Sequence, residues 1–392
     1  MNYKLITDDK TLLDVCERAA KTPAVAIDTE FVRTKTYTPG LGLLQMFDGE
    51  QLVLIDPIAI NDLSPFVALM CNEDVIKVLH SCSEDIETFL SAFSCVPSPI
   101  FDTQFAASVL GIGPTLGYAR LVEMLCGVTL DKGESRTDWL ARPLRESQLS
   151  YAANDVLYLL PAYKLLEQKI NDVGKYDWVV QEIEALAQKK RAQIPPQYAY
   201  LQLKNIWRLT IEQLTVFQHL AAWRLEVARE KNLALNFVVR EGQLFDIAVK
   251  MPASRTALSG IADIAPQTLR RYGNTLLELV EEARGVYQNT AEKSRLKRVR
   301  RLIDFPLYKK HFSAVKQLCF EVAQQQGVGE DVIASKKQIN QLLKWYWFDI
   351  DETRAQGLKP DLLSGWRGPL LAAGIEGILG DVASSDKSAS KR

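Results

Sequence analysis

The sequence predicts an α/β domain with a mixed sheet flanked by helices, followed by two smaller all-α domains. In the first part of the chain, three closely spaced apolar runs precede alternating helical and strand patterns, which favours a mixed sheet. Beyond about residue 190 the pattern is almost wholly helical. In this second part, short sequences recur at an offset of about 95 residues, which indicates two copies of one module.

The expected elements of the α/β domain follow from apolar periodicity. Three strands are expected near 23–28, 41–47 and 51–56, and Asp48-Gly49 between the last two is a hairpin signal. After them we expect a helix near 63–71, a strand near 75–79, helices near 84–93, 103–110 and 116–126, and one long helix near 147–170. The order of the strands in the sheet does not follow from this pattern.

The domain boundaries follow from composition and from the repeat. Pro195-Pro196 resists both helix and central strand, so we expect a linker there. The repeat is clearest where Leu225-Glu-Val-Ala228 recurs as Phe320-Glu-Val-Ala323. The last residues carry too little apolar surface to fold. The expected segments are an α/β domain over 1–190, a linker over 191–209, helical domains over 210–290 and 291–376, and a disordered tail over 377–392.

Composition limits the class of protein. The 392 residues carry a net charge of −1, so a protein of this kind that binds nucleic acid must concentrate its positive charge locally. The six cysteines show no CxxC spacing and follow no secretory signal, so we expect reduced, mostly buried thiols. No apolar run is long enough for a membrane span, and no heptad pattern indicates oligomers. We therefore expect a soluble, cytoplasmic monomer without a membrane partner.

Three acids follow predicted strands directly or with a short turn between. Asp28 and Glu30 end the first strand and share one of its faces, because Thr29 between them points the other way. Asp85 lies in the first turn of a helix that Ser83 could cap. Each motif alone also fits a plainer interpretation, either a solvated strand end or an acid that complements a helix dipole.

A fourth acid lies on the long helix near 147–170. Tyr151 and Asp155 are four residues apart, so the phenol and the carboxylate share one helix face, although an exposed Asp beside a packed Tyr would look the same. Four convergent carboxylates repel one another unless cations hold them, so the complete set predicts divalent metal. Oxygen ligands without a His/Cys cluster favour Mg²⁺ or Mn²⁺ over zinc. Metal beside a positioned phenol suggests phosphodiester hydrolysis.

The segments around these residues resemble the ribonuclease D family, in the tyrosine-bearing branch of the DEDD exonucleases. The resemblance covers residues 1 to 190, and the remainder resembles the helical HRDC region of that family. The matching segments are Asp28-Thr-Glu-Phe-Val-Arg33, Leu41-Gly-Leu-Leu-Gln45, Phe47-Asp-Gly49, Leu54-Ile-Asp-Pro57, Glu134-Ser-Arg-Thr-Asp-Trp139 and Tyr151-Ala-Ala-Asn-Asp155. The resemblance implies a ribonuclease H-like fold for the first domain.

The resemblance also implies a 3′–5′ exoribonuclease that releases 5′-nucleoside monophosphates and trims the 3′ ends of precursor tRNA and other small structured RNAs. We expect Asp28, Glu30 and Asp155 to hold one divalent cation, and Asp28 with Asp85 to hold a second. Tyr151 is expected to orient the attacking water or to accept its proton. These five residues form the expected catalytic set.

Further residues are expected near the substrate by resemblance. They are Phe31, Leu44, Gln45, His80, Lys132, Ser135 and Trp139. Arg136 or Arg142 could hold phosphate, whereas we interpret Asp102 as a helix cap. The basic segment 293–301, between the two helical domains, could bind phosphate or could be an ordinary solvated surface.

Two other functions stay open on the sequence alone. The same five residues would serve a DNA 3′–5′ exonuclease of the proofreading type, because only contacts to the 2′-hydroxyl discriminate RNA from DNA. A non-catalytic nucleic-acid-binding protein, in which the paired HRDC modules do the binding, is the second alternative. The complete set of five catalytic residue types favours an enzyme.

Overall fold

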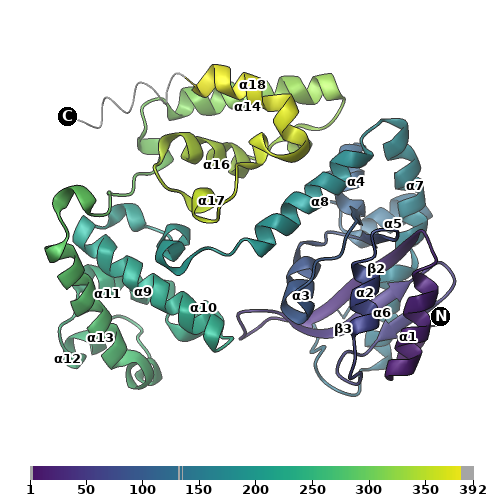
Figure 1. Ribbon diagram of the computed structural model, residues 1–392, viewed down its shortest axis with the longest axis horizontal. Helices are drawn as coiled ribbons and strands as arrows, with labels where there is room; N and C mark the ends of the chain where they lie inside the picture. Colours follow the sequence, from purple (N-terminus) through teal and green to yellow (C-terminus); the bar gives the residue numbers. More distant parts are fainter. Residues whose placement is uncertain (1–2, 131–132, 135, 381–392) are drawn as a thin grey trace.

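The computed structural model describes residues 3–130, 133–134 and 136–380. Its first domain is built on a six-stranded sheet of order β1-β4-β3-β2-β5-β6 (Figure 1). Strand β3 pairs antiparallel with both β2 and β4, whereas β1·β4, β2·β5 and β5·β6 are parallel. The predicted mixed sheet is therefore confirmed. The strands are β1 Lys4–Ile6, β2 Ala24–Val32, β3 Gly40–Phe47, β4 Leu52–Ile55, β5 Ile76–Leu79 and β6 Ile100–Asp102.

Helices flank the sheet, as expected. They are α1 Asp9–Ala19, α2 Ser64–Met70, α3 Ser83–Phe93, α4 Thr103–Val109, α5 Tyr118–Cys126, α6 Glu146–Leu157, α7 Leu159–Asp172 and α8 Tyr176–Arg191. The single helix expected near 147–170 is wrong, because the chain breaks into α6 and α7 at Tyr158. Pro161 explains the break: it has no N–H to donate to the carbonyl of Leu157, and its ring would collide with that carbonyl in a continuous helix.

The sheet separates two apolar cores. On one face, Ala24 and Ala26 of β2 pack in a core that includes Ala152 of α6. On the other face, Val25 and Ile27 pack in a core with residues of α1, α2 and α3. Because side chains alternate along β2, its last residues continue this division. Asp28 and Glu30 therefore lie on the α6 face of the sheet, and Thr29 lies on the α3 face.

The second half of the chain contains two helical modules with the same order of elements. The first comprises α9 Ile211–Glu230, α10 Leu235–Val238, α11 Glu241–Lys250, α12 Arg255–Ser259 and α13 Pro266–Asn289. The second comprises α14 Tyr308–Gln326, α15 Glu330–Ile333, α16 Lys336–Trp347, α17 Glu352–Ala355 and α18 Gly368–Leu379. In the second module the 3₁₀ helix Asp361–Leu363 stands in the place of α12, since Leu258-Ser-Gly260 recurs as Leu363-Ser-Gly365, and α17 is an additional element before it. Among the described residues, no helix is both long and apolar enough to cross a membrane.

Two of the expected segment boundaries need correction. Most of the expected linker is folded: Pro196 begins a 3₁₀ helix, and Tyr200, Ile206 and Leu209 are buried in the core of the first module. The two prolines do exclude an α-helix, but proline suits the first position of a helical turn. The expected tail begins too early, because α18 continues to Leu379. Residues 381–392 lie outside the described part of the chain.

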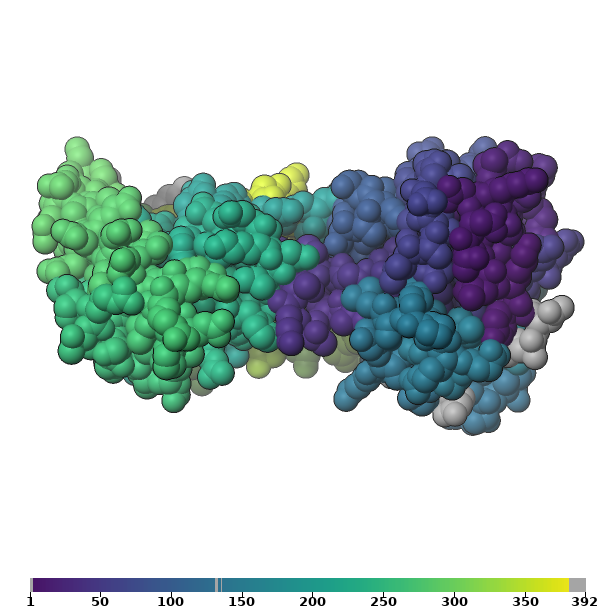
Figure 2. Space-filling view, turned by 90° about the horizontal axis from the view of Figure 1, so that it is seen from below, coloured from purple at the N-terminus to yellow at the C-terminus, as the bar shows by residue number. Residues whose placement is uncertain are grey.

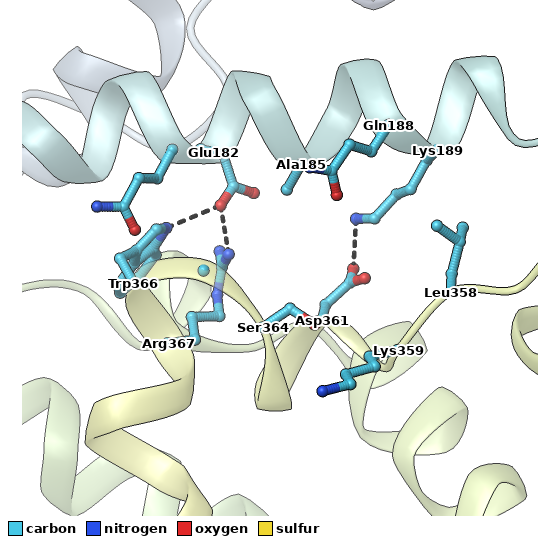
Figure 3. A pocket seen from close by; sticks show the side chains of 12 residues that line it. Glu182, Ala185, Gln188, Lys189, Leu358, Lys359, Asp361, Ser364, Trp366 and Arg367 are labelled. Atoms are coloured by element: carbon cyan, nitrogen blue, oxygen red, sulfur yellow. Dashed lines mark hydrogen bonds and ion pairs between the residues drawn. The ribbon is translucent and has the colours of Figure 1, made fainter.

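The second module packs directly against α8 of the first domain. The indoles of Trp178 and Trp366 stack with ring centroids 4.1 Å apart. Glu182 accepts a hydrogen bond from Trp366 Nε1 at 2.9 Å and pairs with the guanidinium of Arg367, which is buried (Figure 3). These contacts bind the C-terminal module to the sheet domain.

The first module contacts the β2–β3 hairpin instead. Thr38 donates from both its backbone N–H and its hydroxyl to Asn232 Oδ1, at 3.0 and 3.1 Å. The N–H of Ala234 donates to the carbonyl of Lys35 at 2.8 Å. Figure 2 shows the purple hairpin lying against the green module. The strand that carries Asp28 and Glu30 therefore continues into a hairpin that contacts the neighbouring domain.

Candidate active site

Strand β2 brings the first two acids to one side of the sheet. Asp28 lies opposite Gln45 of β3 and Glu30 lies opposite Leu43, and the register shifts between Glu30 and Phe31. Asp155 approaches the same place from α6. One carboxylate oxygen from each of Asp28, Glu30 and Asp155 lies within 4.8 Å of the others. The structure thus brings together three of the predicted metal ligands.

Helix α6 supplies Asp155 together with Tyr151. Buried Ala152 and Val156 pack this helix against the sheet core, and the one-turn spacing places Tyr151 and Asp155 on its site-facing side. Burial raises the pKa of Tyr151, and the negative charges of Asp155 and Glu30 raise it further. The phenol therefore stays protonated and can donate a hydrogen bond into the site.

Asp85 reaches the site from α3 and is held by a hydrogen bond from Thr29 of β2. The Thr29 hydroxyl donates to Asp85 Oδ1 at 2.6 Å, and Asp85 is buried. Asp85 lies outside the group of three close carboxylates, but its charge contributes to the raised pKa values of Asp28 and Glu30. The expected cap from Ser83 is wrong, because Ser83 is the first helical residue and the helix has no side-chain cap.

Burial and mutual repulsion control the charge of the four acids. Burial first, and then the neighbouring carboxylates, raise the pKa of Asp28 well above its ordinary value and that of Glu30 to about 9. Burial also raises the pKa of Asp155 to about 7 and that of Asp85 to about 6. Such a set can be fully ionised near neutral pH only beside positive charge. These oxygen donors, half-buried at Asp28, Glu30 and Asp155 and buried at Asp85, therefore fit a divalent cation.

Tyr118, at the start of α5, is a neighbour of the site that the sequence does not indicate. Its hydroxyl donates to the carbonyl of Asn154 at 3.0 Å. Burial raises its pKa, and the charges of Asp155 and Asp28 raise it further. No motif marks this residue, because a single Tyr that opens a helix has no pattern of its own. Its proximity to the acids arises only from the packing of α5.

The expected substrate residues on β2 and β3 occupy different environments. Phe31 is half-buried just beyond Glu30, where the pairing register shifts. Gln45 is fully buried directly across from Asp28, and its side-chain amide has no hydrogen-bond partner among the described residues. Leu44 faces the opposite core and is fully buried there. A substrate contact from the Leu44 side chain is therefore wrong, because neighbouring strand residues point to opposite faces.

Two further expected substrate residues are enclosed by protein. His80 places Nδ1 2.9 Å from the Thr103 hydroxyl and Nε2 3.0 Å from the Leu116 carbonyl, and burial lowers its pKa. Its ring packs against Tyr118, with centroids 5.6 Å apart. Trp139 is 1% exposed and packs against Tyr151. The expected direct contact between Trp139 and the substrate is wrong, since its indole is buried and packs against Tyr151. Lys132 and Ser135 lie outside the described residues.

The structure also decides the roles of two other residues. Arg142 forms a two-point ion pair with Asp56, through Nε and Nη2 at 2.7 Å each, and also donates to the Gly42 carbonyl. The expectation that Arg142 holds phosphate is therefore wrong, because its guanidinium is committed within the fold. Asp102 accepts from the backbone N–H groups of Gln104 and Phe105, which confirms it as the cap of α4.

The basic segment 293–301 is partly used for packing between domains. The guanidinium of Arg301 stacks on Trp207 at 4.2 Å, and that of Arg300 lies 4.0 Å from the ring centre of Phe305. Lys297 forms an exposed ion pair with Asp349. The two aromatic contacts give Arg300 and Arg301 a structural role, whereas the exposed pair of Lys297 contributes little, and phosphate binding stays a prediction.

Family profiles match three parts of the chain and define the class of protein. A 3′–5′ exonuclease family matches residues 3–171, an HRDC domain matches 213–280, and a ribonuclease D C-terminal HRDC domain matches 306–375. The first match contains all five residues of the expected catalytic set. The chain is thus an exonuclease-domain protein that carries two HRDC modules, and its acidic cluster indicates divalent metal use.

Similar proteins extend over nearly the full length. Ribonuclease D of Serratia proteamaculans is 45% identical over 97% of this chain and 99% of its own, and ribonuclease D of Escherichia coli is 43% identical with the same coverage. The crystal structure of Escherichia coli RNase D, described as an exoribonuclease involved in structured RNA processing, superposes with a TM-score of 0.89 and covers 97% of this chain and 99% of that one. This chain belongs to the ribonuclease D family.

Proposed function

We propose that this protein is a 3′–5′ exoribonuclease that hydrolyses the terminal phosphodiester of RNA with two divalent cations. The observation that carries the proposal is the group formed by Asp28, Glu30 and Asp155, whose carboxylate oxygens lie within 4.8 Å of one another beside Tyr151. Family membership over almost the whole chain supports RNA as the substrate.

The four acids would bind the cations, and the phenol of Tyr151 would position the attacking water. Asp28, Glu30 and Asp155 would hold one cation, and Asp28 together with Asp85 a second, with Mg²⁺ or Mn²⁺ favoured by the oxygen donors. When bound, the cations neutralise charge on the scissile phosphate and polarise the attacking and departing oxygens. The protonated phenol of Tyr151 would donate a hydrogen bond that orients the attacking water. Its raised pKa argues against a role as the proton acceptor.

The reaction breaks the bond between phosphorus and the 3′ oxygen of the penultimate nucleotide. Water adds a hydroxyl to phosphorus, and the departing 3′ oxygen takes up a proton. The products are a 5′-nucleoside monophosphate and an RNA shortened by one residue. Phe31, half-buried beside Glu30, is placed to stack on a terminal base. Gln45 is fully buried on β3 opposite Asp28, so, like Trp139, it would lie behind the site rather than touch the nucleotides.

We further propose that the substrates are 3′ extensions of precursor tRNA and other small structured RNAs. The Escherichia coli relative is an exoribonuclease involved in structured RNA processing, which supports this class. The two HRDC modules would hold the folded part of the RNA while its end enters the site. Action as a monomer in the cytoplasm remains our expectation from the sequence.

The test is digestion of one RNA labelled at its 3′ end in one sample and at its 5′ end in another, with Mn²⁺ or with chelator. A 3′ label should appear at once as mononucleotide, a 5′ label should remain on a shortening series, and chelator should stop both. A matched DNA oligomer is the control for sugar preference, and faster release from DNA would overturn the assignment. Unchanged turnover in Asp28→Ala would identify the activity as a contaminant.

A further inference from the structure

Two cysteines far from the acidic cluster lie in contact. Cys71 immediately follows α2, and Cys95 follows α3 by two residues. Their Sγ atoms are 3.3 Å apart, Cys71 is exposed and Cys95 is half-buried. A disulfide requires the sulfurs to approach to about 2.05 Å, so a displacement of about one ångström would suffice. No other pair among the six cysteines, all of which are described, makes such a contact.

A buried lysine binds together the two connections that carry these thiols. Lys77 is fully buried, and its Nζ donates to the carbonyls of Asn72 at 2.6 Å, of Val75 at 2.7 Å and of Ser98. Burial lowers the pKa of Lys77 to about 8, whereas negative charge at Cys71 or Cys95 favours its protonated form. The Lys77 cation likewise acts against the rise in the pKa of Cys95. Lys77 therefore holds the segment after α2 close to the segment after α3 and places its ammonium group near both sulfurs.

The two thiols differ in a way that assigns their roles. Burial first, and then the hydrogen bond with Cys71, raise the pKa of Cys95 to about 12. Cys95 therefore keeps its proton and can donate it toward a Cys71 thiolate. The exposed Cys71 is the sulfur that a solution oxidant can reach first. This is the arrangement of an attacking thiol with a resolving thiol behind it.

We propose that Cys71 and Cys95 are an oxidation site that closes to a reversible intramolecular disulfide on reaction with a low-molecular-weight disulfide. The Cys71 thiolate attacks one sulfur of the oxidant, which breaks the oxidant's S–S bond and releases one thiolate. Cys95 then gives up its proton and attacks the Cys71 sulfur of the mixed disulfide, which releases the second small thiolate. Two protein thiols are oxidised, one small disulfide is reduced, and the protons pass to the two released thiolates.

The cross-link would anchor the end of the helix that carries Asp85. It would join positions 24 residues apart and tie the α2–β5 connection to the segment after α3. Closing a loop restricts the unfolded chain more than the folded one, so the oxidised protein should be the more stable form. We expect its Tm to rise by several degrees.

The test uses the full-length protein incubated with oxidised glutathione, followed by thiol counting after unfolding. Wild type should fall from six free thiols to four, with Cys71 and Cys95 joined in one cross-linked peptide and the Tm raised. Cys71→Ser and Cys95→Ser should each fail to form the link and show no rise in Tm. Cys126→Ser, at another partly exposed cysteine, is the matched control and should fall from five thiols to three.

Three results would overturn the proposal. They are a stable glutathione adduct on Cys71 in wild type, a disulfide between two chains, and an equal loss of paired thiols in Cys71→Ser. Circular dichroism of each variant before oxidation separates misfolding from a missing link. Since thiol number and peptide identity are the readouts, the result does not depend on nuclease activity.

Discussion

The hydroxyl of Thr29 and Oδ1 of Asp85 lie 2.6 Å apart in a buried hydrogen bond that joins β2 to α3. Thr29 points away from Asp28 and Glu30, yet it fixes the acid that approaches them from the helix. The position of the Asp85 carboxylate therefore depends on a residue on the opposite face of β2 from Asp28 and Glu30.

Replacing this hydroxyl should weaken the site without removing any of its acids. Thr29→Val keeps the shape of the side chain but leaves Asp85 without its donor, so we expect metal affinity or activity to fall by about 10-fold to 100-fold. The measurement is the rate of mononucleotide release as Mn²⁺ is titrated. Thr29→Ser restores the donor and should stay close to wild type, whereas equal losses in both variants would contradict this role for the hydroxyl.

Asp155→Asn should abolish activity and yet stabilise the metal-free protein at neutral pH. Folding raises the pKa of Asp155 from 3.8 to about 7, so the folded state holds a proton that the unfolded state releases in this interval. The Asp155 carboxyl therefore does not lower the free energy of unfolding below pH 3.8, and it lowers it increasingly as the pH rises toward 7. We expect the free energy of unfolding of the metal-free variant to exceed that of wild type by on the order of 1 kcal/mol or more at pH 8.

Urea unfolding in chelator at pH 4 and pH 8 measures this effect. The gain from Asp155→Asn should be small at pH 4 and large at pH 8, and added Mn²⁺ should reverse it by stabilising wild type alone. A metal-free wild type that is the more stable of the two at pH 8 would refute the electrostatic account.

Tyr151→Phe should lower kcat by about 100-fold while KM and stability change little. The loss follows from the missing hydrogen-bond donor, since the aromatic ring that packs on Trp139 is retained. The pH–rate profile should keep its shape, because the Tyr151 phenol does not titrate in the working range. If wild type shows an alkaline limb that the variant lacks, Tyr151 acts as a base after all.

Gly42→Ala should destabilise the first domain. A Cβ at this position would lie 2.6 Å from the carbonyl oxygen and 2.7 Å from the Cβ of Trp139, so the segment beneath Tyr151 must shift. We expect a loss of about 1–3 kcal/mol in urea unfolding, together with reduced turnover. Gly40→Ala on the same strand is the control, because its Cβ would make only ordinary contacts, with Leu140 at 3.5 Å and with the Val32 carbonyl oxygen at 3.7 Å.

Glu182→Ala should loosen the C-terminal module from α8. The change removes the acceptor of Trp366 Nε1 and leaves the guanidinium of Arg367, whose side chain is 7% exposed, without its carboxylate. We expect the free energy of local opening in α18, measured by hydrogen exchange, to fall by about 1–3 kcal/mol. Lys189→Ala is the control, since its more exposed ion pair with Asp361 should contribute at most about 1 kcal/mol.

Local patterns in the sequence predict much of this fold and of the site. Strand alternation places Asp28 and Glu30 on one face, and the one-turn spacing places Tyr151 beside Asp155. The same alternation forbids Leu44 and Gln45 from both facing the substrate, a constraint that a resemblance between sequences does not express.

The remaining features depend on contacts between distant parts of the chain. The hydrogen bond from Thr29 to Asp85 spans 56 residues, and Tyr118 reaches the acids only because α5 packs against α7 and the Tyr118 hydroxyl bonds to the Asn154 carbonyl of α6. Arg142 looks like a free cation in the sequence, and its ion pair spans 86 residues to Asp56. The break between α6 and α7 is different, because Pro161 is visible in the sequence and its effect on the preceding turn is a local one.

The β2–β3 hairpin makes the first HRDC module a structural part of the nuclease. Its tip, at Lys35 and Thr38, is hydrogen-bonded to Ala234 and Asn232, and its base carries the acids. Cutting the chain after α8 would remove these partners and leave a long, unsupported hairpin attached to the acids of the site. An engineered minimal nuclease would therefore have to redesign that hairpin before it could dispense with the module.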